Sequence, residues 1–366
     1  MIVFVAGTTA EFIKIAPVIV ELDKRGIDYR IWSTAQHAQG VEETLSDLGV
    51  RQPDRYLVSK HRTGVATVSQ VPRWLADLTV TTLRSLPTLR QEANKGIVAV
   101  HGDTFTTVIG AILGRTIGAK VAHIEAGLRS GSWRSPFPEE LNRRIVGRLA
   151  HIHFAPTARE AQNLKYRIGR RGVRVVVTEA NTVVDALRTA REVQAPAPEL
   201  PEEFGLVTLH RFELVHDREA YRTVIERVKE LSHKIPLVMI IGKSEQALLA
   251  EYGFENIFDE RLIPIDKLGY SSFQAILLRA KLVITDSGGL QEECAALGIP
   301  CAVHREYTER HQGLGANIVL TGMNVDVLDD FLANWSDYQR PSQLDAFHPS
   351  RMIVDVLEEE TGPQGA

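Results

Sequence analysis

Two carboxylates each follow directly after a predicted strand, a position suited to acid/base chemistry. Asp103 follows an apolar run at 97–101 and Glu125 follows a second at 120–124, so each comes directly after a predicted strand. Carboxylates at the carboxyl ends of neighbouring parallel strands can point into one crevice, where crowding and partial burial raise one pKa and leave the other group ionised. The pair is therefore suited to general acid/base catalysis.

Glu139 and His210 extend this set. Glu139 opens a predicted helix, and His210 ends a predicted strand, where a histidine can protonate or bind a phosphate group. Three of the four also have a structural interpretation: Asp103 as a helix cap, Glu139 as the complement of a helix dipole, and His210 as a hydrogen-bonding residue. Glu125 lies beside the turn at Gly127 and has no obvious structural role.

A second group has the composition of an anion site. A strand-like run at 281–285 leads through Ser287, Gly288 and Gly289 into a predicted helix over 289–298. The first-turn amides of a helix lack intrahelical partners and lie at the positive end of its dipole, and glycines let a phosphate approach them closely. The alternative is a plain helix cap by Ser287, since serine is a favoured N-cap residue.

Common cofactor motifs are missing from the sequence. No Gly-x-Gly-x-x-Gly follows a predicted strand, and no Gly-x-x-x-x-Gly-Lys-Ser/Thr phosphate loop occurs. His151 and His153 stand at strand spacing, but such a pair without a third ligand is far more often part of a sheet face than a zinc site. We therefore expect no cofactor and no metal.

The elements that must position these residues alternate along the chain. Short β-branched runs are followed by amphipathic segments, a pattern typical of βα units and of a parallel sheet with helices on both faces. The predicted strands lie at 2–6, 97–101, 120–124, 205–209, 236–241, 281–285 and 300–304. The predicted helices lie at 11–25, 104–117, 217–232, 270–280, 289–298 and 350–360. The fold class is therefore α/β.

A proline-rich stretch divides the chain. Residues 188–204 contain Pro196, Pro198 and Pro201, which neither a helix nor a central strand tolerates well, so this stretch is interpreted as a linker. We expect one domain at 1–187 with the carboxylates and another at 205–349. The segment 350–366 is expected to pack back on the first domain. Two such halves leave a cleft at the carboxyl ends of their strands, the usual ligand position in open α/β folds.

Composition narrows the function classes. The 366 residues carry 42 basic and 46 acidic side chains, a formal charge of −4, which argues against electrostatic binding to nucleic acid or to a membrane surface. Two cysteines are too few for a disulfide framework. No stretch has the length and apolarity of a membrane span, and the start does not read as a signal peptide. A cytoplasmic protein is expected.

Taken together, six segments in the same order along the chain resemble the UDP-N-acetylglucosamine 2-epimerase family. They are Gly7-Thr8-x-x-Glu11-Phe12-Ile13-Lys14, the run from Gly102-Asp103-Thr104 to His123-Ile124-Glu125-Ala126-Gly127, Ser135-Pro136-Phe137-Pro138-Glu139-Glu140-x-Asn142-Arg143, His210-Arg211, Thr285-Asp286-Ser287-Gly288-Gly289-x-Gln291-Glu292-Glu293 and Thr308-Glu309-Arg310. The resemblance extends from residue 2 to about residue 320. It implies a glycosyltransferase-B-type fold of two Rossmann-like domains, and a homodimer.

The resemblance also implies a reaction. In the family, UDP is lost across C1 and C2 of a UDP-HexNAc, and the resulting 2-acetamidoglucal is re-protonated at C2 on its other face. The acid/base groups implied are Asp103, Glu125 and Glu139, with His210 on the leaving phosphate. The diphosphate is assigned to Ser287, Gly288 and Gly289, the ribose to Glu293, the sugar or phosphate to Arg310 and the uracil to Phe273. Further substrate-binding residues implied are Lys14, His37, Arg143 and Arg211.

Departures from the family pattern keep other outcomes open. The usual Gly-Thr-Arg-Pro reads Gly7-Thr8-Thr9-Ala10 here, so an arginine expected near the diphosphate is missing. Weaker retention of UDP favours trapping of the intermediate by water, which makes a hydrolysing epimerase that releases N-acetylmannosamine an alternative. A UDP-sugar-dependent glycosyltransferase and a catalytically inactive nucleotide-sugar sensor are two more.

Overall fold

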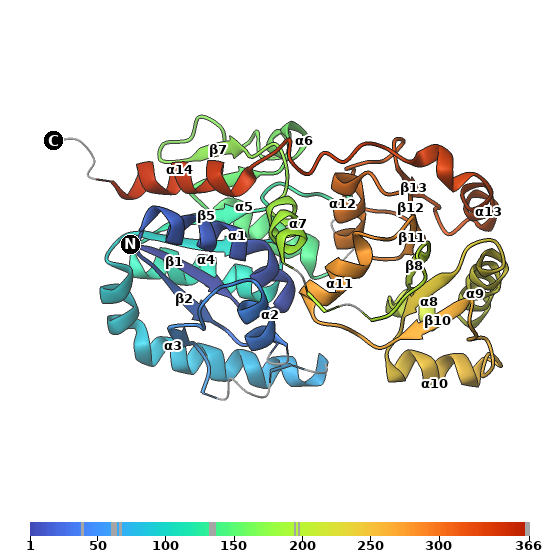
Figure 1. The fold of residues 1–366 in the computed structure, drawn as a ribbon. Helices are drawn as coiled ribbons and strands as arrows, with labels where there is room; N and C mark the ends of the chain where they lie inside the picture. The colour runs from blue at the N-terminus through green and yellow to red at the C-terminus, as the bar shows by residue number, and fades with distance from the viewer. Residues whose placement is uncertain are drawn as a thin grey trace. The chain divides into compact units, whose positions relative to one another are not determined.

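The computed structural model describes residues 1–37, 40–59, 64–65, 68–131, 137–193, 195–196 and 198–362. The chain divides into two compact units (Figure 1). The N-terminal unit comprises Met1–Thr189 and Phe347–Ala366, and the C-terminal unit comprises Ala190–Ala346. Within the described ranges, no helix has the length and apolarity to cross a membrane.

The N-terminal unit is an alternation of strands and helices. Its strands are β1 (Ile2–Ala6), β2 (Tyr29–Ser33), β3 (Arg55–Tyr56), β4 (Ile97–His101), β5 (Lys120–Ile124), β6 (Ile152–Ala155) and β7 (Arg174–Val177). Its helices are α1 (Thr9–Arg25), α2 (Val41–Asp47), α3 (Val71–Ala93), α4 (Phe105–Ile117), α5 (Glu139–Leu149), α6 (Ala158–Gln162), α7 (Val183–Glu192) and α14 (Pro349–Thr361), with a 3₁₀ turn at Val68–Gln70.

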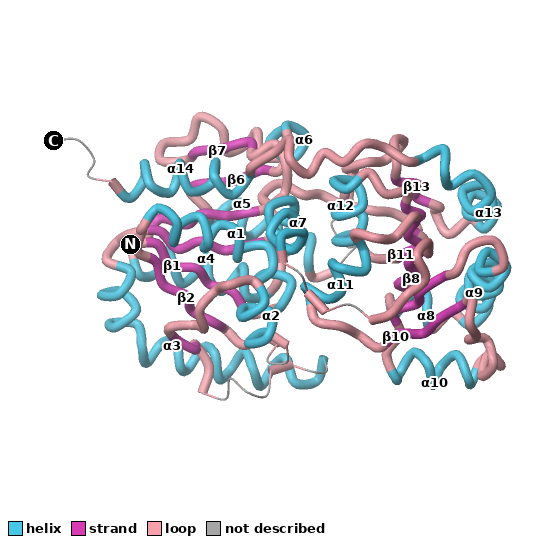
Figure 2. The backbone as a smooth tube through the Cα atoms, in the orientation of Figure 1, coloured by secondary structure: helices cyan, strands magenta, loops and turns pink. Residues whose placement is uncertain are grey.

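All strands of the N-terminal sheet pair in parallel, in the order β3-β2-β1-β4-β5-β6-β7. Figure 2 shows strands of this sheet in magenta, with β1, β2, β5, β6 and β7 labelled. The chain builds outward from β1 to β3 and then restarts on the other side of β1 with β4. The crevice between β1 and β4 is therefore a topological switch point, the position where open α/β sheets bind ligands. Val3, Val5, Val98 and Val100 of these two strands are fully buried in one hydrophobic core.

Helix α14 closes the N-terminal unit by packing against α1, although the two are more than 300 residues apart (Figure 1). Arg25 near the end of α1 donates to Asp355 of α14 at 2.6 Å. Helix α7 continues to Glu192, so the first residues of the expected linker at 188–204 are helical. The linker expectation was wrong for 188–192, because Ala190 in this helix is buried and the proline-rich composition starts only at Pro196.

The C-terminal unit repeats the plan. Its strands are β8 (Gly205–Thr208), β9 (Leu237–Ile240), β10 (Leu262–Ile265), β11 (Leu282–Thr285), β12 (Cys301–Val303) and β13 (Ile318–Leu320). Its helices are α8 (Phe212–Val215), α9 (Arg218–Ser232), α10 (Lys243–Glu251), α11 (Tyr270–Leu277), α12 (Gly288–Leu297) and α13 (Val325–Asn334), with a 3₁₀ turn at Trp335–Tyr338.

The strand order β10-β9-β8-β11-β12-β13 is again parallel throughout. The chain builds outward from β8 and restarts with β11, so the switch point of this sheet lies between those two strands. The segments that leave β8 and β11 carry His210 and Ser287. The topology thus brings together two predicted site residues that are 77 residues apart in sequence.

Candidate active site

Glu125 is the most constrained of the predicted site residues. Its side chain is 3% exposed, and its Oε2 accepts a hydrogen bond from Lys14 Nζ of α1 at 2.6 Å and another from the Asn181 amide. His101 Nε2 lies 4.0 Å from the same oxygen. The backbone of Glu125 has φ +63°, a left-handed conformation that is uncommon for glutamate and tends to persist at functional sites. The fold therefore holds this carboxylate in one orientation.

Asp103 is held at the end of the neighbouring strand. Arg143 of α5 contacts Asp103 Oδ2 through Nε at 2.8 Å and through Nη2 at 2.6 Å, and Asn142 donates to the Asp103 carbonyl at 2.8 Å. The cap of α4 is Thr104, whose hydroxyl accepts from the Thr107 amide. The alternative role of Asp103 as the helix cap is therefore wrong, because Thr104 already does this.

The Glu125 carboxyl group lies near Gly102, which has φ +69° and directly precedes Asp103. A β-carbon built on Gly102 would lie 3.6 Å from Glu125 Oε1, so the Glu125 carboxyl group lies against the residue that precedes Asp103. The Gly102 carbonyl accepts from His123 Nε2 at 2.7 Å. Burial lowers the pKa of His123 to about 4, which keeps this imidazole neutral at pH 7.

Glu139 is the first residue of α5, one helical turn before Arg143. Residues four apart lie on one face of a helix, so Glu139 lies on the same face of α5 as Arg143, the partner of Asp103. Its Oε2 is buried and has no hydrogen-bond partner among the described residues. Ser135 and Pro136, which belong to the same predicted motif, lie outside the described residues. Both interpretations of Glu139, acid/base group and dipole complement, are compatible with this position.

The turn after β1 positions α1, the helix that carries Lys14. Glu11 Oε2 accepts from the amides of Gly7 and Thr8, each at 2.9 Å, and Glu11 Oε1 accepts from the Thr104 hydroxyl at 2.6 Å. Thr8 completes a capping box with Glu11, which is why α1 begins earlier than the periodicity predicts. His37 lies beside this turn, since its amide donates to the Gly7 carbonyl at 2.7 Å.

In the C-terminal unit, Asp286 organises the switch point. This buried carboxylate follows β11 and accepts from the backbone amides of His210 and Arg211, each at 2.8 Å. Its other oxygen lies 3.2 Å from His210 Nδ1. The His210 side chain is 52% exposed. Because Nδ1 faces Asp286, the other ring nitrogen, Nε2, is turned away from the carboxylate, and Asp286 thereby orients the imidazole.

Ser287 is the N-cap of α12, as the structural alternative predicted. Its hydroxyl accepts from the Leu290 amide at 3.4 Å and its carbonyl accepts from the Gln291 amide at 3.1 Å. The amides of Gly288 and Gly289 precede these two and have no intrahelical acceptor by helix geometry. The cap and the anion site are therefore compatible, because they use different amides.

Two acidic residues of α12 connect the remaining predicted residues. Glu292 contacts Arg310 Nη1 at 2.5 Å, and both side chains are less than one-tenth exposed. Glu293 accepts from Gln274 of α11 at 3.0 Å, and the residue before Gln274 is the half-buried Phe273. Arg310 and the neighbour of Phe273, Gln274, thus contact α12, which carries Glu293 itself.

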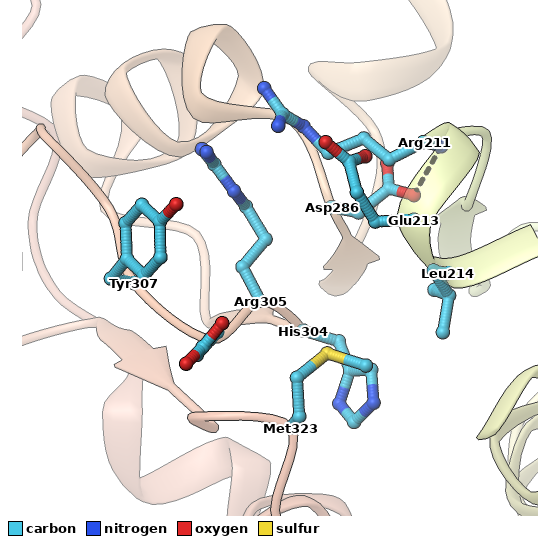
Figure 3. Close-up of a pocket in the computed structure, with 9 residues that line it drawn as sticks. Arg211, Glu213, Leu214, Asp286, His304, Arg305, Tyr307 and Met323 are labelled. Atoms are coloured by element: carbon cyan, nitrogen blue, oxygen red, sulfur yellow. Dashed lines mark hydrogen bonds between the residues drawn. The ribbon is translucent and has the colours of Figure 1, made fainter. Parts of the chain in front are cut away.

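A pocket of ≈ 250 Å³ opens within the C-terminal unit (Figure 3). Its lining comes from the segments after β8, β11, β12 and β13 and comprises Arg211, Glu213, Leu214, Asp286, His304, Arg305, Glu306, Tyr307 and Met323. Figure 3 shows the side chains of Arg211 and Arg305 on the same side of this pocket. The lining combines two arginines with three carboxylates, and Arg211 and Asp286 are the chain neighbours of the predicted site residues His210 and Ser287.

The predicted residues form two groups, one in each unit. The N-terminal unit contains Lys14, His37, Asp103, Glu125, Glu139 and Arg143. The C-terminal unit contains His210, Arg211, Phe273, Ser287, Gly288, Gly289, Glu293 and Arg310.

Three residues with a clear part in this geometry were not predicted as site residues. Asn181 donates to Glu125, Asp286 orients His210, and Arg305 lines the pocket. The position of Asp286 directly before the Ser-Gly-Gly turn was the available signal. Asn181 and Arg305 had none in local spacing, because their partners are 56 and 17 residues away.

The model of the UDP-N-acetylglucosamine 2-epimerase family matches residues 20–346. A UDP-N-acetylglucosamine 2-epimerase of Yersinia pestis is 34% identical, over 89% of this chain and 88% of its own length. One of Bacillus subtilis is 32% identical, over 96% of this chain and 93% of its own length.

A solved structure gives the same result. The UDP-GlcNAc 2-epimerase of Neisseria meningitidis bound to UDP-GlcNAc superposes with a TM-score of 0.80 at 28% identity, covering 98% of this chain and 99% of that one. The predicted α/β fold of glycosyltransferase-B type is confirmed. With a family model matched along most of its length and relatives above 30% identity, the chain belongs to the UDP-N-acetylglucosamine 2-epimerase family.

Proposed function

We propose that this protein epimerises UDP-N-acetylglucosamine at C2 of the sugar. The observation that carries the proposal is the buried Glu125 carboxylate, fixed by Lys14 and Asn181 and adjacent to the segment of Asp103. The Neisseria meningitidis relative, whose structure contains UDP-GlcNAc, supports the choice of substrate.

The proposed reaction has two half-steps. In the first, a carboxylate removes the C2 proton, the C2–H electron pair forms the C1–C2 double bond, and the C1–O bond breaks with both electrons leaving on UDP. In the second, a carboxylic acid protonates C2 on the opposite face while a UDP oxygen re-forms the bond to C1. The product is UDP-N-acetylmannosamine, and no electrons are gained or lost overall.

The carboxylates suit this division of work. The Lys14 ammonium compensates the negative charge of Glu125, so this group is suited to the ionised state. Among the described residues, no cation contacts Glu139, whose Oε2 has no partner. Glu125, Asp103 and Glu139 are proposed as the acid/base set, and proton transfer by a positioned group typically contributes about 10²- to 10⁴-fold to the rate.

The C-terminal unit is proposed to bind the nucleotide. His210, oriented by Asp286, contacts the leaving phosphate, and the amides of Gly288 and Gly289 bind the diphosphate at the positive end of α12. Glu293 is proposed for the ribose hydroxyls and Phe273 for the uracil. The reaction needs no cofactor, because the leaving group is already attached to the sugar.

Product analysis tests the proposal. NMR of UDP-N-acetylglucosamine incubated with the enzyme should show UDP-N-acetylmannosamine accumulating to an equilibrium. Glu125→Gln should abolish this, while Glu92→Gln, which removes a carboxylate paired with Arg55 at 2.5 Å elsewhere in the N-terminal unit, should not. Free N-acetylmannosamine with UDP identifies the hydrolysing alternative, acceptor-dependent UDP release identifies a glycosyltransferase, and no turnover at all identifies a sensor.

We also propose that the protein is a cytoplasmic homodimer. The support is the family resemblance, together with exposed apolar side chains on α3, where Val80 is 45% exposed and Leu83 is 59% exposed. Sedimentation should give twice the chain mass of 40.7 kDa. A mass of one chain would contradict the dimer.

A further inference from the structure

Arg305 is a buried cation with an unused donor. The residue follows β12 and is 7% exposed, and its Nη1 is buried without a hydrogen-bond partner among the described residues. Its nearest acidic contact is Glu309, whose Oε2 lies 3.5 Å from the other terminal nitrogen, Nη2. A buried donor on a charged group that lacks an acceptor is strongly unfavourable, so an acceptor is expected to meet it in the functional protein.

The unused donor is directed at the start of α12. A β-carbon built on Gly288 would lie 3.3 Å from Arg305 Nη1 and 3.5 Å from both Cδ and Nε of Arg310. Two guanidinium groups therefore lie against one glycine at the positive end of a ten-residue helix. A side chain at position 288 would occupy the space that these groups share.

Two of the acidic side chains nearby have other partners. Glu292 pairs with Arg310 at 2.5 Å, and Asp286 accepts from the amides of His210 and Arg211. Arg211 also lines the pocket with Arg305 (Figure 3). A helix N-terminus and guanidinium groups are both suited to bind an anion of more than one charge.

We propose that Arg305 is a phosphate-binding residue, whose Nη1 donates to a phosphate oxygen held by the Gly288 and Gly289 amides. The ligand class is a diphosphate, and the identification of that diphosphate as the UDP part of the substrate rests on the proposed function above. Arginine suits this position because its planar fork can contact two phosphate oxygens at once.

The test compares ligands that differ only in their phosphates. Calorimetry on the full chain measures the dissociation constants of uridine, UMP, UDP and inorganic pyrophosphate. Arg305→Gln should raise the dissociation constants of UDP and pyrophosphate by roughly 10- to 100-fold, as expected for the loss of one charge-assisted contact. The dissociation constant of uridine should stay within about twofold of the parent value. Arg305→Lys, which keeps the charge but loses the fork, should be intermediate and covers the case in which Arg305→Gln does not fold.

The matched control is Arg222→Gln, which removes an exposed arginine of the same unit that pairs with Glu226 at 3.0 Å. It should bind all four ligands like the parent protein. UDP and pyrophosphate affinities within twofold of the parent in a folded Arg305→Gln variant, or an equal loss for uridine, would overturn the role of Arg305. Binding of neither anion by the parent protein would overturn it as well.

The same data separate this proposal from the proposed function. If the parent protein binds pyrophosphate through Arg305 but binds neither UDP nor UDP-N-acetylglucosamine, the anion site stands and the epimerase assignment fails. If UDP-N-acetylglucosamine is turned over and Arg305→Gln changes neither the affinity for UDP nor KM, the epimerase assignment stands and the role of Arg305 fails.

Discussion

Lys14 and Glu125 form an ion pair with 2.6 Å between Nζ and Oε2, and their side chains are only 12% and 3% exposed. The two residues are 111 positions apart, and the pair joins the helix after β1 to the end of β5. A buried pair of this kind gives little net stability, because desolvation of both charges offsets their attraction. Its value lies in holding an ionised carboxylate in one place.

Removing Lys14 alone should therefore lower the free energy of unfolding more than removing both Lys14 and the Glu125 charge. Lys14→Met should lower the free energy of unfolding by about 3–5 kcal/mol, because a buried charge is left without its counter-ion. Adding Glu125→Gln to Lys14→Met should recover most of that loss, since the unpaired charge is then gone. Urea denaturation of the two single variants and the double variant measures this. Additive losses in the double variant would contradict the account.

Arg143, which the resemblance implies as a substrate-binding residue, is also expected to position Asp103 through two contacts with its carboxylate. Arg143→Lys cannot reproduce the two contacts with Asp103 Oδ2, so kcat should fall roughly 10- to 100-fold while KM changes little. Arg144→Lys is the control, because Arg144 lies on the same helix and contacts Glu140 at 2.9 Å. Steady-state kinetics decide the matter, and a raised KM with kcat unchanged would instead indicate substrate binding by Arg143.

His123 should make stability depend on pH. Burial lowers its pKa from 6.5 to about 4, so between these pH values His123 is protonated in the unfolded chain and neutral in the folded protein. The stabilisation is complete above about pH 6.5 and is lost as the pH falls towards 4, at up to ~1.4 kcal/mol per pH unit. His123→Gln should reduce the slope of unfolding free energy against pH by one proton over this window. An unchanged slope in urea titrations at pH 7, 6 and 5 would refute it.

Replacing Gly288 by alanine should affect thermal stability and UDP binding in opposite directions. Gly288→Ala places a methyl group 3.3 Å from the terminal nitrogen Nη1 of Arg305, in a helix where alanine is favoured over glycine by up to about 1 kcal/mol. The melting temperature should therefore stay equal or rise, while UDP binds at least several-fold more weakly. Gly110→Ala is a useful contrast, because its β-carbon would lie 2.6 Å from Val100 and should lower the melting temperature. Unchanged UDP affinity in Gly288→Ala would contradict the anion site.

The regular elements could be predicted because they depend on local pattern. The strands at 2–6, 97–101 and 120–124 were predicted with the bounds of β1, β4 and β5, since their apolar runs are short and end at turn residues. Helix starts were less accurate. The start of α1 was placed at Glu11, because the sequence pattern did not reveal that Thr8 and Glu11 cap each other.

The predicted site residues could be found one by one, but their partners could not. Lys14 with Glu125 and Arg143 with Asp103 are pairs formed by sheet topology between segments far apart in sequence. The unused donor of Arg305 is also a property of packing, since nothing in the order of residues 301–310 shows which nitrogen lacks an acceptor. Residue types indicate the chemistry, and long-range packing decides which groups are available for it.

In the proposed reaction, this protein removes the proton at C2 of the sugar and delivers another to the opposite face. The most direct measurement is NMR of UDP-N-acetylglucosamine incubated with the enzyme in deuterated water. Deuterium is expected at C2 of the UDP-N-acetylhexosamines, at a rate that Glu125→Gln abolishes and Glu92→Gln does not change. Turnover of the sugar nucleotide with the C2 hydrogen fully retained would contradict removal of the C2 proton.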